Sequence, residues 1–172
     1  MQKTLSILVD DTPGVLARIG GLFYRRGYNI TSLSVGQTES PGKSRFTVTF
    51  EGDEATAEQI RKQAQKLINV IKTSEHCSDN SEIREFALIK VNFIESNKTE
   101  VQHLVEFYKG KIIDIFDEAA IIEITEEDYR IDKLMNRLSH YGIIESLRTG
   151  KVVMFRGSKS INSSRNKHRS IE

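Results

Sequence analysis

The chain has 172 residues and a formal net charge of +1, so it is long enough for one or two small domains and carries no overall field that favours nucleic acid or an anionic membrane. Its apolar runs are all shorter than the ~20 residues of a membrane-spanning helix, and its first residues lack the features of a signal peptide or transit peptide. The single cysteine, Cys77, excludes an internal disulfide and is typical of a reducing compartment.

The first half of the chain predicts a β-α-β-β-α-β order, the split βαβ unit of ferredoxin-like domains. Apolar and polar residues alternate over Lys3–Asp10, which predicts a half-buried strand. Asp11 or Thr12 is expected to cap the following helix, with Pro13 in its first turn. The pattern then predicts that this helix continues to about residue 26 and is followed by two strands, near 30–35 and 46–50, which SPGK joins as a hairpin. A second helix is expected from residue 53, with an apolar period that continues to 71, and a last strand is expected near 70–75.

The second half repeats this order after a polar, turn-prone segment, HCSDNSE, so we place a linker at 79–83. We predict an α+β protein of two tandem ferredoxin-like βαββαβ domains, an N-terminal domain at 3–78 and a C-terminal domain at 84–157. Residues 158–172 have few apolar side chains and predict a disordered basic tail. The elements expected in the second domain are a strand at 86–93, a helix at 101–108, a hairpin of 112–116 and 119–125, a helix at 131–141, and strands at 143–147 and 152–155.

The turn DDTPG, at 10–14, carries the chemistry that we consider most informative. The first amides of a helix have no internal partner, and the helix dipole adds positive charge there, so such a turn can hold a carboxylate. Gly14 lets a ligand approach closely, and Asp11 can face an ammonium group. Asn29, which we expect on the same edge of the sheet as this turn, can both donate and accept. These groups predict a site for the zwitterionic head of a free amino acid, although the turn alone is equally compatible with a plain helix cap.

A resemblance to a known family favours the first interpretation. The run DDTPGVLARIGGLFYRRGYNITSLSVGQTE resembles the ACT domain of the small regulatory subunit of acetolactate synthase, and its RGYNI-x-SL-x-VG stretch is highly specific to that family. QKLINVIK at 65–72 and REFALIKV at 84–91 extend the resemblance, which continues to about Gly157. It implies a chain without catalysis of its own, which binds and activates a large catalytic subunit and makes it sensitive to branched-chain amino acids, usually valine.

The resemblance also implies a site, an assembly and a place in the cell. ACT domains of this family pair side by side as homodimers, and the turn of one protomer meets the Asn-bearing strand of the other around the effector. Thiamine diphosphate, Mg²⁺ and FAD are expected on the catalytic subunit and no cofactor on this chain. The location implied is a bacterial cytoplasm or a plastid stroma. Carried over by position, the effector contacts are Asp11, Gly14, Val15, Leu16, Asn29 and Ile30.

The sequence was also compared with three other functions: a stand-alone amino-acid sensor, an RNA-binding module and an enzyme. A stand-alone amino-acid sensor with a different client protein stays open, because an ACT site does not name its partner. An RNA-recognition motif shares the βαββαβ order, but the stretch KSRFTVTF lacks the glycines of the RNA-binding signature, and Phe46 and Phe50 alternate as core residues do.

An enzyme is the third possibility. His76 and Cys77 are neighbours on a strand, where adjacent side chains point to opposite faces and do not converge on a substrate. The other histidines have no metal-ligand spacing, so we predict no catalytic residue, no metal ligand, and neither a nucleic-acid nor a membrane partner. These histidines are His103, His140 and His168.

Overall fold

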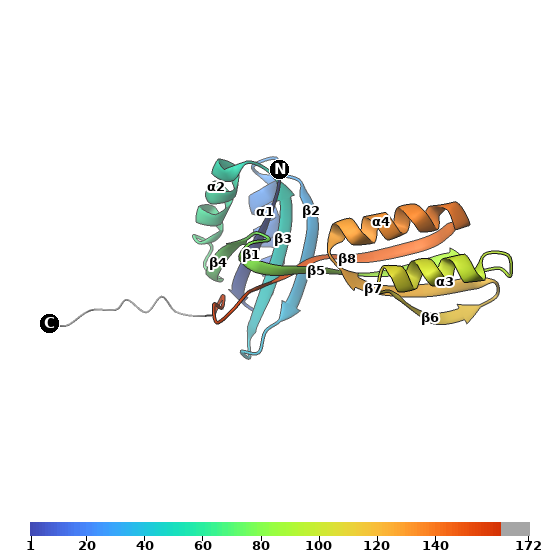
Figure 1. Ribbon diagram of the computed structural model, residues 1–172. Helices are drawn as coiled ribbons and strands as arrows, with labels where there is room; N and C mark the ends of the chain where they lie inside the picture. Colours follow the sequence, from blue (N-terminus) through green and yellow to red (C-terminus); the bar gives the residue numbers. More distant parts are fainter. Residues whose placement is uncertain (163–172) are drawn as a thin grey trace. The chain divides into compact units, whose positions relative to one another are not determined.

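The computed structural model describes residues 1–162 of the chain, and they form two four-stranded sheets, each covered by two helices (Figure 1). The predicted α+β class with two ferredoxin-like βαββαβ repeats is confirmed. No helix in residues 1–162 is both long enough and apolar enough to cross a membrane.

The first sheet has the order β2-β3-β1-β4, with β1 (Gln2–Asp10) pairing antiparallel with both of its neighbours. Helices α1 (Val15–Tyr24) and α2 (Glu54–Ala64) cover one face. Because strand side chains alternate, every second residue of β1 joins this core. The other strands are β2 (Ile30–Gln37), β3 (Lys43–Glu51) and β4 (Val70–His76). Largest among the core side chains are Leu5, Ile7, Ile19, Phe23, Phe46, Phe50 and Ile60.

The second sheet has the order β6-β7-β5-β8 and repeats the same plan around a separate core. Its strands are β5 (Ser81–Asn92), β6 (Lys111–Phe116), β7 (Ala119–Glu126) and β8 (Ile143–Phe155). Helices α3 (Lys98–Phe107) and α4 (Asp128–Leu138) pack on it, and the 3₁₀ turn η1 (Ser139–Tyr141) follows α4. The core includes Ile89, Val91, Phe93, Val101, Ile122, Ile124, Ile131 and Leu134.

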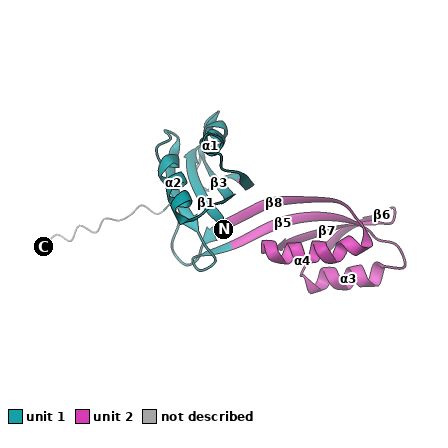
Figure 2. Cartoon of the chain, turned by 90° about the horizontal axis from the view of Figure 1, so that it is seen from above, with its two compact units in different colours: residues 1–31, 35–82, 153–172 teal, residues 32–34, 83–152 magenta. Residues whose placement is uncertain are grey.

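Two compact units can be distinguished, and the ends of the long strands are divided between them (Figure 2). By their contacts, residues 153–162 group with the first unit, although the sequence pattern of the C-terminal domain extends to 157. The reason is contact: Arg45 donates from Nη2 to the Val153 carbonyl at 2.7 Å, and Ile161 is buried. Within the predicted tail, residues 158–162 are therefore ordered by packing, and the rest of it lies outside the described residues.

Two element boundaries differ from prediction. Helix α2 ends at Ala64, and Ile68, which we had counted on its apolar face, is 91% exposed. The two strands expected at 143–147 and 152–155 are one continuous strand, β8. At the polar residues between them, the Thr149 hydroxyl accepts from the Phe86 amide at 3.2 Å, so a side chain links β8 to β5 there.

Candidate functional site

The turn between β1 and α1 is built around Gly14, which has φ 85° and ψ −3°. This left-handed conformation carries a steric cost for any residue with a Cβ atom, so glycine suits the position. A Cβ placed on Gly14 would meet no atom within 4 Å, which means that the space in front of the turn is open. A ligand can therefore approach the backbone directly.

Several amides of this turn are left without a partner. The expected side-chain cap from Asp11 or Thr12 is wrong, because Gly14 is the cap residue and no side chain bonds to the helix start. The Val15 amide donates weakly to the Thr12 carbonyl at 3.3 Å. Within residues 1–162, the amides of Gly14 and Leu16 have no acceptor, so they are available to an anion.

Asn69, just before β4, braces the turn from the side. Its amide Nδ2 donates to the Thr12 hydroxyl at 2.9 Å, and its Oδ1 accepts from Arg18 Nη1 at 2.6 Å. The Thr12 side chain is thereby held away from the helix start, which explains why it does not cap. Sequence reasoning missed Asn69, since nothing in its local pattern shows that it lies beside a turn 57 residues away.

Asn29 and Ile30 lie at the far end of the sheet from this turn, so the expectation that they share its edge is wrong. Asp11 donates its amide to Gly42, beside the Asp10 end of β1. Thr31, next to Ile30, bonds instead to the Thr49 carbonyl at 3.1 Å, beside the Gln2 end. Strand β1 has nine residues, so these two ends are roughly 25 Å apart.

The turn and Asn29 are far apart because of the way in which the chain connects β1 to β2. Helix α1 carries the chain back along the sheet, so β2 starts at the opposite end from where β1 finishes. In one chain the turn and Asn29 are therefore separate. Of the predicted contacts, Asp11, Gly14, Leu16 and Asn29 are exposed, Ile30 is half-buried, and Val15 is buried in the core.

His76 lies in a buried hydrogen-bonded cluster that has no access to a substrate. Its Nε2 is 2.8 Å from Ser6 Oγ and its Nδ1 is 2.7 Å from Ser81 Oγ. Ser6 is fully buried, which rules out this serine–histidine pair as a nucleophile and base. Burial, together with the positive charges of Arg45 and Lys159, lowers the pKa of His76 to about 4. Its neighbour Cys77 is exposed.

No group of three or more His, Cys, Asp or Glu side chains in the described part of the chain is arranged to hold a metal ion. His103 and His140 are exposed, and His168 lies outside the described residues. The arrangement that remains is the open helix start at Gly14, which can bind a carboxylate, and the distant Asn29.

Comparison with known families gives two matches that together span most of the chain. The family described as an AHAS (acetohydroxyacid synthase) small subunit-like ACT domain matches residues 5–72. The family described as the small subunit of acetolactate synthase matches residues 84–157. The first match contains both the turn at Gly14 and Asn29.

Individual proteins and a solved structure agree with these matches. The chain is 43% identical over 159 residues to a probable acetolactate synthase small subunit from Archaeoglobus fulgidus, covering 92% of this chain and 99% of that protein. It is also 43% identical to the acetolactate synthase small subunit of Mycobacterium leprae, covering 94% and 96% of the two chains. The crystal structure of the acetolactate synthase small subunit from Thermotoga maritima superposes with a TM-score of 0.85 at 43% identity, covering 92% of this chain and 99% of that one.

Proposed function

The chain belongs to the family of acetolactate synthase small subunits, and on that premise we propose that it is the non-catalytic regulatory subunit of an acetolactate synthase. Its partner is a separate large subunit that makes 2-acetolactate from pyruvate, on the route to valine, leucine and isoleucine, and holds thiamine diphosphate, Mg²⁺ and FAD. This chain raises the activity of that subunit and makes it sensitive to feedback by valine. The setting is a bacterial cytoplasm or a plastid stroma.

We place the valine site between two copies of the chain. The turn at Gly14 and the Asn29 end of β2 lie roughly 25 Å apart in one chain, so a single copy does not bring all of the predicted contacts to one ligand. A second copy that brings its own Asn29 to the turn completes the set. The site is then a property of the homodimer, and its occupancy depends on how the two copies are arranged.

The groups of the two half-sites fit the parts of valine one by one. The carboxylate takes the amides of Gly14 and Leu16, where the helix dipole adds positive charge. The ammonium group faces the Asp11 carboxylate or the side-chain carbonyl of the partner's Asn29. The isopropyl group rests on apolar side chains from both copies, which excludes polar amino acids of similar size.

Regulation follows from sharing one ligand between two copies. A ligand shifts a conformational equilibrium only as far as it binds one state better than the other. Valine stabilises the dimer arrangement that completes its site, and the catalytic subunit senses that arrangement through its contact surface. The typical coupling between two such sites is ~1–3 kcal/mol, enough to change activity several-fold.

The observation that carries this proposal is the open, left-handed turn at Gly14 with unpaired amides behind it. The test is a calorimetric titration of the purified chain with valine, using leucine, isoleucine and serine for comparison. We expect saturable valine binding that is lost in Gly14→Asp, because the new carboxylate occupies the open space and repels the ligand. Asn29→Ala should weaken binding at least about tenfold, since it removes the other half-site.

Gly157→Asp is the matched control for the turn variant. Gly157 has φ 69° and open space around its Cα, so the substitution imposes a similar backbone strain elsewhere. It should leave valine binding unchanged. Equal loss of binding in both glycine variants would contradict a specific role for the turn. A second titration with the large subunit present tests whether the catalytic partner is needed to complete the site.

A further inference from the structure

A groove with a volume of about 590 Å³ lies between helices α3 and α4 of the second unit. The two helices lie side by side in both views of the chain (Figures 1 and 2). One wall comes from the end of α3 and the residue after it, and the other comes from α4, so the whole groove belongs to one unit. Its lining is mainly aromatic and basic and includes Phe107, Tyr108, Tyr129, Arg130, Lys133 and Arg137.

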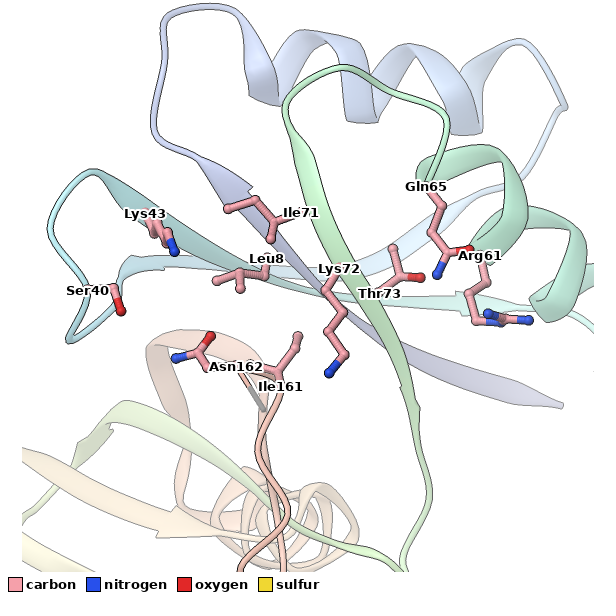
Figure 3. A pocket seen from close by; sticks show the side chains of 10 residues that line it. All are labelled: Leu8, Ser40, Lys43, Arg61, Gln65, Ile71, Lys72, Thr73, Ile161 and Asn162. Atoms are coloured by element: carbon pink, nitrogen blue, oxygen red, sulfur yellow. The ribbon is translucent and has the colours of Figure 1, made fainter. Parts of the chain in front are cut away.

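The positive charges of this groove lie on one side of α4. Arg130, Lys133 and Arg137 follow one another at spacings of three and four residues, which places them on the same face of the helix. The larger hollow of the first unit is different (Figure 3): Lys72 and Thr73 are consecutive on β4, so their side chains point to opposite faces of the sheet. The cations of the groove, by contrast, can face a single partner.

Aromatic rings hold two of these cations without neutralising them. The Lys133 ammonium lies 5.4 Å from the centre of the Tyr129 ring, and the Arg130 guanidinium lies 5.9 Å from the centre of the Tyr108 ring. Such cation–π contacts restrain a side chain and leave its charge in place. Arg130 is also 3.5 Å from the Glu126 carboxylate, so part of its charge is already compensated.

Lys133 and Arg137 carry the uncompensated charge of the groove. Within residues 1–162 neither side chain has a carboxylate partner, and no carboxylate belongs to the lining. The acidic residues of the same helix, Asp128 and Asp132, form ion pairs with basic side chains of β8, outside the groove. The charge of Lys133 and Arg137 is therefore available to a partner molecule.

The exposure of the aromatic side chains favours a protein as that partner. Phe107 and Tyr129 are 74% and 48% exposed, whereas small molecules usually bind in pockets that enclose most of their surface. Exposed Phe, Tyr and Arg side chains that gather on one surface are typical of the centre of protein interfaces, where a few such residues supply most of the binding energy. The positive charge of the groove is complementary to an acidic segment.

The end of this chain does not have the required charge. Residues 163–172, SSRNKHRSIE, contain more basic than acidic side chains. The groove would repel them, so its acidic occupant comes from another protein.

We propose that the groove binds an acidic segment of the catalytic large subunit. Carboxylates of that segment lie on Lys133 and Arg137, and an apolar side chain packs against Phe107 and Tyr129. This inference rests on the proposed function, because it takes the large subunit as the partner. It goes beyond that function by locating a contact surface in the second unit, whereas the Gly14 turn belongs to the first.

The test is a calorimetric titration of the full chain with the purified large subunit of the same organism. We expect Lys133→Glu to weaken binding at least about tenfold, because it removes one positive charge and its carboxylate can pair with Arg137 four residues further along the helix. Lys98→Glu is the matched control: it makes the same change of charge at the start of α3, outside the lining, and removes only an exposed ion pair with Glu95. It should change the affinity less than about twofold.

Phe107→Ala tests the apolar part of the contact. Because Phe107 is largely exposed, the fold should be preserved, as judged by circular dichroism, while binding of the large subunit weakens about tenfold. Phe116→Ala is the matched control, since Phe116 is 72% exposed in the same unit and lies outside the lining. It should leave the affinity unchanged.

The outcomes separate this inference from the proposed function. If the original chain does not bind the large subunit, the proposed function is wrong and this inference fails with it. If the original chain binds and Lys133→Glu or Phe107→Ala has no more effect than its control, only the inference is overturned. A changed sedimentation velocity of Lys133→Glu without the large subunit would assign the groove to contacts between copies of this chain and would also overturn it. Valine titrations of Lys133→Glu alone should be normal, which keeps the result distinct from the effector site.

Discussion

At the scale of single residues, the most constrained side chain is His76, because its partners determine where its proton lies. Arg45 can only donate, and it donates to Ser6 Oγ from both Nε at 3.3 Å and Nη2 at 2.9 Å, which occupies both acceptor positions of that hydroxyl. The Ser6 hydroxyl therefore donates to Nε2 of His76, whose Nδ1–H donates to Ser81 Oγ. The Ser81 hydroxyl in turn donates a hydrogen bond to Asn80 Oδ1 at 2.6 Å. A neutral imidazole satisfies every group in this series, and a protonated one does not.

The stability of the chain should therefore depend on pH through His76. Its pKa is about 4 in the folded chain and 6.5 as the ordinary value, so below pH 6.5 the unfolded chain binds a proton that the folded chain does not. Stability contributed by the neutral ring is complete above pH 6.5 and is lost as the pH falls towards 4. The loss is of the order of 3 kcal/mol, measured by urea unfolding at several pH values.

The comparison that isolates this effect uses two variants. In His76→Gln the difference in stability between pH 7 and pH 4.5 should shrink, since the titrating ring is gone, although the variant is less stable at pH 7. His103→Gln changes an exposed histidine and should keep the pH dependence of the original chain. An unchanged slope in His76→Gln would show that other groups cause the acid sensitivity.

At the scale of elements, the first two helices begin in different ways, and the difference matters for function. Helix α2 has an ordinary cap, in which the Asp53 carboxylate accepts from the Thr56 amide at 2.8 Å. Helix α1 has Gly14 in its place and leaves its first amides open. Helices α3 and α4 also begin without a side-chain cap, so it is the open space in front of Gly14, together with the unpaired amides, that suits the start of α1 to a ligand.

The Asp53 cap gives a prediction at this scale. Asp53→Ala removes the acceptor for the Thr56 amide, and we expect the melting temperature to fall by roughly 2–4 °C. Hydrogen bonding to the Thr56 side chain and then to its amide holds the pKa of Asp53 below its ordinary value, so the capping benefit should be present at neutral pH and decline in acid as the carboxyl group is protonated. Asp79→Ala, in an exposed turn, should leave the melting temperature unchanged.

Strand β8 shows why local pattern alone misplaced an element. Arg148 and Thr149 interrupt its apolar run, and from the sequence they favour a break. In the fold Arg148 donates from Nε and Nη2 to the buried Glu85 at 2.8 and 2.7 Å, and from Nη1 to Asp132 at 2.5 Å. These partners lie on β5 and α4, far away in the sequence, so a polar stretch becomes the middle of a strand.

At the scale of the whole molecule, the separation of the turn from Asn29 and the edge position of strand β2 are the two observations behind the proposed second copy. Strand β2 is at the edge of the first sheet, so within residues 1–162 it has a neighbouring strand of that sheet on one side only. Leu33 and Val35 on this strand are 37% and 48% exposed. An apolar edge strand tends to pair with another chain. The proposed homodimer covers this edge and supplies the missing Asn29.

Val35→Lys tests the proposed dimer. Because Val35 is half exposed in the single chain, the substitution should preserve the fold, as judged by circular dichroism, while the added charge weakens pairing along this edge. We expect sedimentation velocity to show a shift towards monomer and calorimetry to show a parallel loss of valine binding. Ile68→Lys is the control, because Ile68 is 91% exposed and does not lie on β2. This variant should keep the sedimentation behaviour and the valine affinity of the original chain. If Val35→Lys dimerises as strongly as the original chain, pairing at this edge is contradicted.

The sequence by itself determined the class of fold, the order of the elements and the family. Apolar periodicity follows directly from which side chains must be buried, so Phe46 and Phe50 could be assigned to the core from their alternation. The Gly14 turn was recognisable because a Pro-Gly pair beside an amphipathic run has few conformations available.

Only the tertiary structure decided what lies next to what. It showed that Asn69 braces the Gly14 turn, that Asn29 is at the opposite end of the sheet, and that Ile161 returns to the first unit. Each of these contacts joins residues far apart in the sequence, and their formation depends on the packing of the whole sheet. The local sequence pattern indicates which side chains of a segment are buried. It does not indicate which distant segment packs against them in the folded chain.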